Sequence, residues 1–476
     1  MRKKQICTMA MAAFLGVGTV FPSLAGPGAG TWRESDGPGV YTEYATSLAP
    51  DVSAWMCKAE YWIEKNYGSD RLLLTREEIA RLNQRILETP ETNMTDLNAL
   101  PETFDGTAMA ASMGDFASPK NLYLDGEPVE EAYYEAIREN IRNAQVTEEM
   151  PVRYGYTVNQ TVMKAYPYGE FLSDSPTDPE WDNLASAGLY VNEPVAIYFA
   201  TADGRFVLAK GQSCSGWVPA EDVAVCKDKE EWMAAKPGEN ILVVTGEKVY
   251  LEAGAILKEV SEKRLPMGTV LERVTDTGLS VTGRIDWNNY VVKLPWREAD
   301  GSFSQKLALI PANRDVSTEY LPFTSAGIID QAFKLLGNRY GWGGMLYSQD
   351  CSSFVKDIYR CFGLEIPRNT TWQAAMPVAV ADMSKMTAEE RTAHLRSLAP
   401  GSILQFPGHE VLYLGEADGK FYVINDVSSV AVSTGEADGV ERVRVRSVIV
   451  STLDTKRMSG KTWFEDLNKS IWVAGE

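Results

Sequence analysis

Histidine is scarce in this sequence, with two in 476 residues, His394 and His409. No two cysteines are separated by two residues, so a zinc site of the usual cysteine and histidine spacing is not expected. Neither a Walker phosphate-binding loop nor a dinucleotide-binding glycine fingerprint occurs. We therefore expect no metal and no cofactor, and chemistry that uses a histidine base has only two candidates.

A surplus of basic residues is also lacking. The formal net charge is −19 and the pI is about 4.8. Nucleic-acid binding depends on lysine and arginine that neutralise phosphates, so this balance argues against a nucleic-acid partner.

Long hydrophobic runs are absent beyond the N-terminus. A basic start at residues 1–4 is followed by a short apolar stretch, and Ser23-Leu24-Ala25 is a small-x-small cleavage pattern. We predict a signal peptide over residues 1–25. The chain is then expected to be exported, either periplasmic or secreted and wall-associated, without stable insertion in a membrane.

Cysteine is rare too, and five remain once Cys7 leaves with the signal peptide. An odd number in an exported protein predicts at least one free thiol. Cys214 and Cys226 flank a short β-like segment and are candidates for a disulfide, which the sequence leaves open.

The rest of the chain has four stretches of different pattern. Residues 26–144 start as a linker rich in Gly, Pro and Ser and continue as helices, one with a capping box at Thr75. Residues 145–228 and 229–318 each hold several short strands with glycine turns, which predicts two small SH3-like β-barrels. Residues 319–476 place helices before antiparallel strands, as in an α+β domain. The predicted fold is multidomain, in that order.

One cysteine begins a predicted helix of the last domain. Apolar residues at helical spacing follow Cys351, namely Phe354, Val355, Ile358 and Tyr359. The free N–H groups and the dipole of a helix N-terminus favour an anion, so we expect a thiol there to ionise readily. Cys351 is therefore a candidate nucleophile, and the alternative is a small buried cysteine capping a core helix.

A cysteine nucleophile needs a base, and the two histidines differ in their surroundings. His394 lies in a charged helical run and is expected at the surface, whereas His409 begins an apolar strand after a Pro-Gly turn. Asn425 ends the next strand, and a hairpin would bring its side-chain carbonyl near His409 to orient the imidazole. By strand alternation, Asp426 should point to the opposite face.

These residues lie in five short motifs: Tyr340-Gly-Trp-Gly-Gly, Asp350-Cys-Ser-Ser-Phe-Val, Ile366-Pro-Arg, Gly401-Ser-Ile-Leu-Gln-Phe and Gly408-His-Glu-Val-Leu-Tyr-Leu-Gly. In this order they resemble the NlpC/P60 cysteine peptidases, whose domain has a papain-like fold. The preceding part of the chain resembles the subgroup that has an N-terminal stabilising segment and two bacterial SH3 (SH3b) domains.

The resemblance implies a γ-D-glutamyl-L-diamino-acid endopeptidase that cuts peptidoglycan stem peptides or muropeptides. It implies Cys351 as nucleophile, His409 as base and Asn425 as the third polar residue, a position where many members carry histidine. In relatives with two SH3 domains one end of the groove is closed. This implies a substrate with a free L-Ala amine, held by Asp350 and Ser352.

Further contacts are expected around this site, each with a structural alternative. Trp342 either lines the groove or belongs to the core, and Tyr340 either donates near the oxyanion or is core. Arg368 either meets a substrate carboxylate or forms a salt bridge. Asp350 can also cap the helix, and its charge opposes a thiolate at Cys351 unless His409 is protonated.

Two other functions fit the same residues. A non-catalytic wall-binding or scaffold protein would use the pair of SH3-like barrels and leave the last domain inactive. A related Cys-His enzyme would be an N-acetylmuramoyl-L-alanine amidase, which cuts between glycan and peptide.

Overall fold

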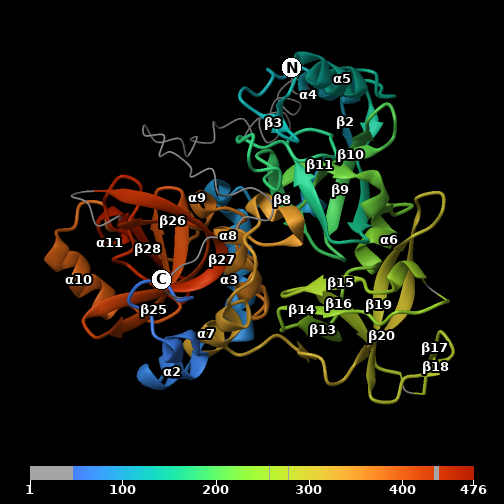
Figure 1. Cartoon of the computed structure of the whole chain (residues 1–476). Coiled ribbons are helices and arrows are strands. Elements are labelled where there is room, and N and C mark those ends of the chain that lie inside the picture. The colour runs from blue at the N-terminus through green and yellow to red at the C-terminus, as the bar shows by residue number, and fades with distance from the viewer. Residues whose placement is uncertain (1–46, 257, 277, 434–438, 476) are drawn as a thin grey trace. The chain divides into compact units, whose positions relative to one another are not determined.

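The computed structural model describes residues 47–475, apart from 257, 277 and 434–438. The described residues form two compact units, coloured along the chain in Figure 1. Unit 1 comprises residues 95–319 with 342–347, and unit 2 comprises 47–94, 320–341 and 348–475. The predicted signal peptide, residues 1–25, lies outside the described residues.

Unit 1 contains a seven-stranded antiparallel sheet in the order β12-β6-β9-β10-β11-β7-β8. Alternating apolar residues such as Val195 and Ile197 turn into its core. Its strands are β6 (Arg153–Thr157), β7 (Thr161–Lys164), β8 (Ala185–Leu189), β9 (Pro194–Ala200), β10 (Phe206–Lys210), β11 (Ser215–Pro219) and β12 (Val223–Val225).

A second sheet in unit 1 has five antiparallel strands and a separate core around Leu242, Leu271 and Ile310. Its strands are β13 (Ile241–Val244), β16 (Val270–Val274), β19 (Asn289–Arg297), β20 (Phe303–Pro311) and β21 (Val316–Ser317). Four short pairs complete the strands of unit 1: β2 (Thr103–Phe104) with β5 (Met150–Pro151), β3 (Tyr123–Leu124) with β4 (Glu127–Pro128), β14 (Lys248–Tyr250) with β15 (Arg264–Pro266), and β17 (Ser280–Val281) with β18 (Arg284–Ile285). The assignment of residues 229–318 as an SH3-like barrel stays a prediction.

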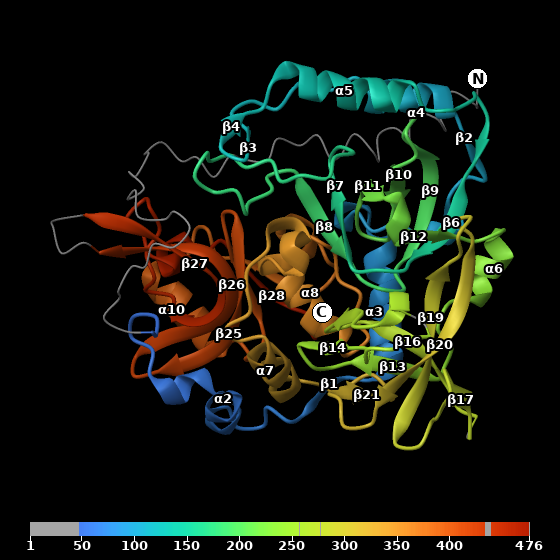
Figure 2. The ribbon, with the colours of Figure 1, turned by 45° about the vertical axis from the view of Figure 1, so that its right-hand side comes forward.

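The helical segment predicted for residues 26–144 is divided between the units, because its two halves pack on different cores. Helices α4 (Gly106–Met113) and α5 (Glu131–Arg142) pack side by side in unit 1, above strands β9 and β10 in Figure 2. Their apolar faces join the core of the seven-stranded sheet. Helix α6 (Lys229–Ala234) buries Trp232 in the same core.

The earlier half packs in unit 2. Helix α2 (Ala59–Lys65) lies against α7 (Ser325–Lys334), and Trp62 is fully buried beside Tyr422. Helix α3 (Arg76–Glu88) begins with the predicted capping box, in which Thr75 and Glu78 bond each other's backbone N–H groups. Strand β1 (Leu72–Leu74) pairs with β22 (Phe323–Thr324), and short 3₁₀ turns η2 (Ala54–Cys57) and η3 (Pro90–Thr92) flank the helices.

Unit 2 is built on a six-stranded antiparallel sheet in the order β23-β28-β24-β25-β26-β27. Helix α8 (Cys351–Arg360) packs against β25 and β26, and its apolar residues are completely buried. The strands are β23 (Ala379–Asp382), β24 (Ile403–Phe406), β25 (His409–Ala417), β26 (Lys420–Ser433), β27 (Val440–Thr452) and β28 (Lys469–Trp472). The helices that follow α8 are α9 (Thr370–Gln373), α10 (Ala388–Ser397) and α11 (Trp463–Asp466).

Two tight turns set the register of the central strands. Pro407 and Gly408 join β24 to β25, so that Phe406 pairs with His409. Asp418 and Gly419 both have positive φ, 50° and 77°, which is the backbone of a two-residue hairpin turn. The hairpin aligns β25 with β26 as the sequence predicts. Among the described residues, no helix is both long and apolar enough to cross a membrane.

Candidate active site

The candidate nucleophile Cys351 is the first residue of α8, and its side chain is buried with 6% exposed. Asp350 is the N-cap and accepts from the Ser353 N–H at 3.0 Å, while Ser353 Oγ accepts from the Asp350 N–H at 2.8 Å. This reciprocal capping box fixes where the helix begins. The thiol therefore lies at the helix N-terminus, as the sequence predicts.

His409 and Asn425 lie on adjacent strands, with His409 Nε2 2.9 Å from Asn425 Oδ1. The Asn425 amide nitrogen faces two acceptors, Ser451 Oγ at 3.2 Å and the Ile449 carbonyl at 3.5 Å. Its carbonyl oxygen must then be the atom that faces His409, and it can only accept. The proton of the neutral imidazole is therefore on Nε2, which leaves Nδ1 free to accept a proton.

The backbone brings the thiol and the imidazole together. The N–H of Glu410, the residue after His409, acts on the Cys351 thiol and by itself lowers the thiol pKa. Burial, then the charges of Asp350 and Glu410, outweigh it and raise the Cys351 pKa well above its usual value. Burial lowers the His409 pKa to about 4, although the Asn425 bond opposes this.

Burial thus opposes the charged forms of both groups, the thiolate and the imidazolium. This differs from the thiolate that a helix N-terminus alone leads one to expect, because loss of solvation and nearby carboxyl groups exceed the helix-dipole effect.

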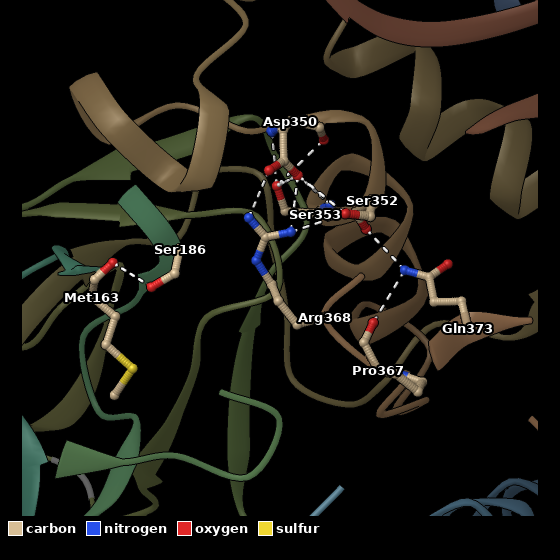
Figure 3. Close-up of polar contacts among 8 residues, drawn as sticks. All are labelled: Met163, Ser186, Asp350, Ser352, Ser353, Pro367, Arg368 and Gln373. Carbon is tan, nitrogen blue, oxygen red and sulfur yellow. Dashed lines mark hydrogen bonds and ion pairs between the residues drawn. The ribbon is translucent and has the colours of Figure 1, made fainter. Parts of the chain in front are cut away.

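Asp350 and Arg368 form a buried ion pair (Figure 3). Arg368 Nη2 is 2.6 Å from Asp350 Oδ2, and Nη1 is 3.0 Å from Oδ1 and 2.9 Å from Ser352 Oγ. The guanidinium and the capping N–H hold the Asp350 pKa below its usual value despite burial. Of the alternatives open for Arg368, the structure shows the salt bridge, and Asp350 caps the helix as well.

Gln373 extends this network from the next helix. Its Nε2 donates to the carbonyl oxygens of Ser352 and Pro367, both at 3.1 Å (Figure 3). The contact ties the start of α8 to the loop that carries Arg368. Gln373 is fully buried and gave no signal in the sequence, since its partners lie up to 21 residues away.

Tyr340 lies with the site residues in unit 2, whereas Trp342 belongs to unit 1. The Tyr340 side chain is buried, and burial followed by the charge of Cys351 raises its pKa well above normal. Trp342 stacks on Trp181, with ring centroids 6.2 Å apart. Its role as a substrate contact stays a prediction.

The close packing of the chain explains why two glycines follow Trp342. Gly343 and Gly344 have φ of 61° and 88°, and a Cβ at Gly344 would lie 2.4 Å from the Gly188 nitrogen of β8. The segment η7 (Trp342–Tyr347) packs this closely on β8 only because both side chains are absent.

The remaining candidate groups lie apart from this arrangement. His394 is half-buried on α10 and bonds Ser470 Oγ at 2.7 Å. Cys214 and Cys226 are not joined to each other, so the disulfide that the sequence left open is not formed. Within the described part of the chain, no three histidine, cysteine or acidic side chains are grouped to hold a metal ion.

Comparison with known proteins locates two domains. Residues 337–463 match the NlpC/P60 family, and residues 171–219 match an SH3 domain of the SH3b1 type. No curated protein matches the chain by sequence.

One solved structure agrees with this chain at the level of fold, and two others superpose less well. An NlpC/P60 endopeptidase from Photobacterium damselae subsp. piscicida superposes with a TM-score of 0.68 at 17% identity, covering 88% of this chain and 97% of that one. An NlpC/P60 family protein from Bacillus cereus gives 0.46 at 15% identity, covering 67% and 99%. NlpC2 from Trichomonas vaginalis gives 0.23 at 13%, covering 65% and 99%.

The family match covers Cys351, His409 and Asn425, and all three lie in one compact unit. The chain thus contains an NlpC/P60 domain, of a family of cysteine peptidases, and an SH3b domain.

Proposed function

We propose that this protein is a γ-D-glutamyl-L-diamino-acid endopeptidase that cuts peptidoglycan stem peptides. The observation that carries the proposal is the bond from His409 Nε2 to Asn425 Oδ1, with Cys351 on the helix that packs against the same two strands, inside a domain of a cysteine-peptidase family. The solved structure that superposes with a TM-score of 0.68 is named an endopeptidase, which supports a peptidase over a passive scaffold.

The chemistry follows from the protonation states. His409 Nδ1 takes the thiol proton of Cys351 as the sulfur attacks the γ-glutamyl carbonyl carbon, and the imidazolium is held by the Asn425 carbonyl. The imidazolium then gives its proton to the leaving amine, and the C–N bond breaks to leave a thioester. Water, deprotonated by His409, attacks the thioester and releases the acid and the free thiol. Free N–H groups at the start of α8 are suited to hold the oxyanion.

Substrate selection is proposed to begin at Asp350 and Ser352. An incoming L-Ala ammonium group would share the Asp350 carboxylate with the Arg368 guanidinium, which already binds both oxygens. We expect a peptide with a free L-Ala amine to be cut faster than its N-acetylated form, because acetylation removes the charge.

The proposal includes export of the chain on the basis of the N-terminal segment, with released or intact wall peptides as the partner. N-terminal sequencing of the mature protein tests this, and a start at Gly26 is the expected result.

The decisive assay incubates the purified protein with L-Ala-γ-D-Glu-diaminopimelate peptides and identifies the products by mass spectrometry. We expect free L-Ala-γ-D-Glu from the native protein and none from Cys351→Ala, a loss of at least about a thousandfold. Cleavage by Cys351→Ala would contradict the mechanism. Release of whole stem peptides from glycan would instead identify an amidase, and no turnover of either substrate would favour a binding scaffold.

A further inference from the structure

Glu410 follows His409 on β25, and its side chain is completely buried. Its Oε2 accepts a hydrogen bond from Gln405 Nε2 at 2.7 Å, and the same amide donates to the Thr370 carbonyl at 2.8 Å. Its Oε1 has no hydrogen-bond partner among the described residues. A buried carboxylate with a single neutral donor is costly, so this group is better accommodated with its proton.

Glu410 lies on β25, against which the helix of the nucleophile packs. Its charge raises the pKa of the Cys351 thiol, and it also raises that of the Tyr359 hydroxyl on the same helix. The charges that act on His409 are those of Arg457 and Asp350. An ionised Glu410 would therefore oppose loss of the thiol proton without a matching stabilisation of the imidazolium.

The other groups around Glu410 come from three elements. Helix α8 and its cap contribute Cys351, Tyr359 and Asp350, the loop before α9 contributes Arg368, and β24 contributes the uncharged Gln405. Burial raises the Glu410 pKa to about 8, Gln405 opposes the rise, Asp350 adds to it and Arg368 lowers it.

We propose that Glu410 is a positioning residue for Cys351 that works only in its protonated form. The neutral carboxyl supports the strand that carries His409 and lets the thiol lose its proton, whereas the carboxylate holds the proton on the sulfur. The proposal rests on the proposed function only in taking Cys351 as the nucleophile.

The test measures alkylation of Cys351 by iodoacetamide between pH 6 and 9.5, read at that residue by peptide mass spectrometry. The variant Glu410→Gln is compared with the native protein. We expect equal rates at pH 6.5, where Glu410 is neutral, and a rate about tenfold higher in the variant at pH 9, as one pKa unit at Cys351 gives. The pH at which kcat/KM falls on the alkaline side should likewise be higher in Glu410→Gln than in the native protein.

Glu416→Gln is the matched control on the same strand. The Glu416 carboxylate pairs with Arg396 at 2.8 Å, which keeps its pKa below normal, so it is charged throughout this pH range. The Cys351 alkylation rate of Glu416→Gln should therefore equal that of the native protein at each pH. A rate ratio for Glu410→Gln that does not change with pH, or an equal shift in Glu416→Gln, overturns the proposal.

A second variant keeps the test valid if Glu410→Gln folds poorly. The hydrogen bond from Gln405 to Glu410 Oε2 lowers the Glu410 pKa, and Gln405→Met removes this bond. The Glu410 pKa should therefore rise, and the alkaline midpoint of the Cys351 alkylation rate should move to higher pH. An unchanged midpoint contradicts the proposal. Alkylation needs no peptide, so its outcome is independent of whether γ-D-glutamyl peptides are the substrate.

Discussion

The orientation of the imidazole depends on one amide side chain. Asn425 is fully buried, and Ser451 and the Ile449 carbonyl hold its nitrogen away from His409. A neutral amide stabilises an imidazolium less than a carboxylate does, so its main contribution is to fix the tautomer and the ring plane.

Asn425→Ala is therefore expected to lower kcat by up to about 100-fold with little change in KM, because a misplaced base is costly. Asn425→His retains an acceptor and should lose less. Steady-state kinetics on the peptide substrate measures both, and equal losses in the two variants would contradict an orienting role.

The base itself sets the acid side of the pH profile. Burial disfavours the charged imidazole and lowers the His409 pKa to about 4, and Arg457 adds to this effect. As pH falls, kcat/KM should persist below 6 and drop near pH 4. Arg457→Gln removes a positive charge and should move this limb upward, whereas a native limb near 6.5 would refute the assignment.

At the scale of elements, helix α8 starts on a buried charged cluster. Asp350 caps the helix and pairs with Arg368. The Asp350 side chain is 6% exposed and the Arg368 side chain is 8% exposed. The local capping pattern is visible in the sequence. The pairing of Asp350 with Arg368, 18 residues away, is not visible there. An arginine at that position would suit a salt bridge and a contact with a substrate carboxylate equally well.

Arg368→Met is expected to destabilise the protein by about 3–5 kcal/mol, because it leaves the Asp350 charge buried and uncompensated. The double variant Asp350→Asn with Arg368→Met should recover most of this loss, since asparagine still caps the helix. Urea denaturation measures the free energy of unfolding of both variants. If the loss in the double variant equals the sum of the losses in the two single variants, the two residues are not coupled.

At the scale of the whole molecule, the two compact units are each built from separate stretches of the chain. Residues 47–94 pack in unit 2 with the NlpC/P60 domain. The Asn83 side chain donates to the Gly363 carbonyl and accepts from the Glu365 N–H. Residues 342–347 pack in unit 1 although the flanking chain is in unit 2. Helical periodicity shows that a helix forms but not which core it joins.

Trp62 tests the importance of the early segment for unit 2. It is fully buried against Tyr422, so Trp62→Ala should cost about 3–5 kcal/mol in the free energy of unfolding. Trp55 is 58% exposed, and Trp55→Ala should change stability by less than about 0.5 kcal/mol. Similar urea midpoints for the two variants would show that the segment contributes little.

The sequence by itself determined the parts of the site that depend on local rules. The helix start at Cys351, the hairpin that aligns His409 with Asn425 and the capping boxes all follow from short-range spacing and turn chemistry. The burial of Cys351, the Asp350–Arg368 bridge and the buried acid at Glu410 came only from the tertiary structure. Those depend on burial and on long-range neighbours, which set solvation and charge and leave no periodic signal in the chain.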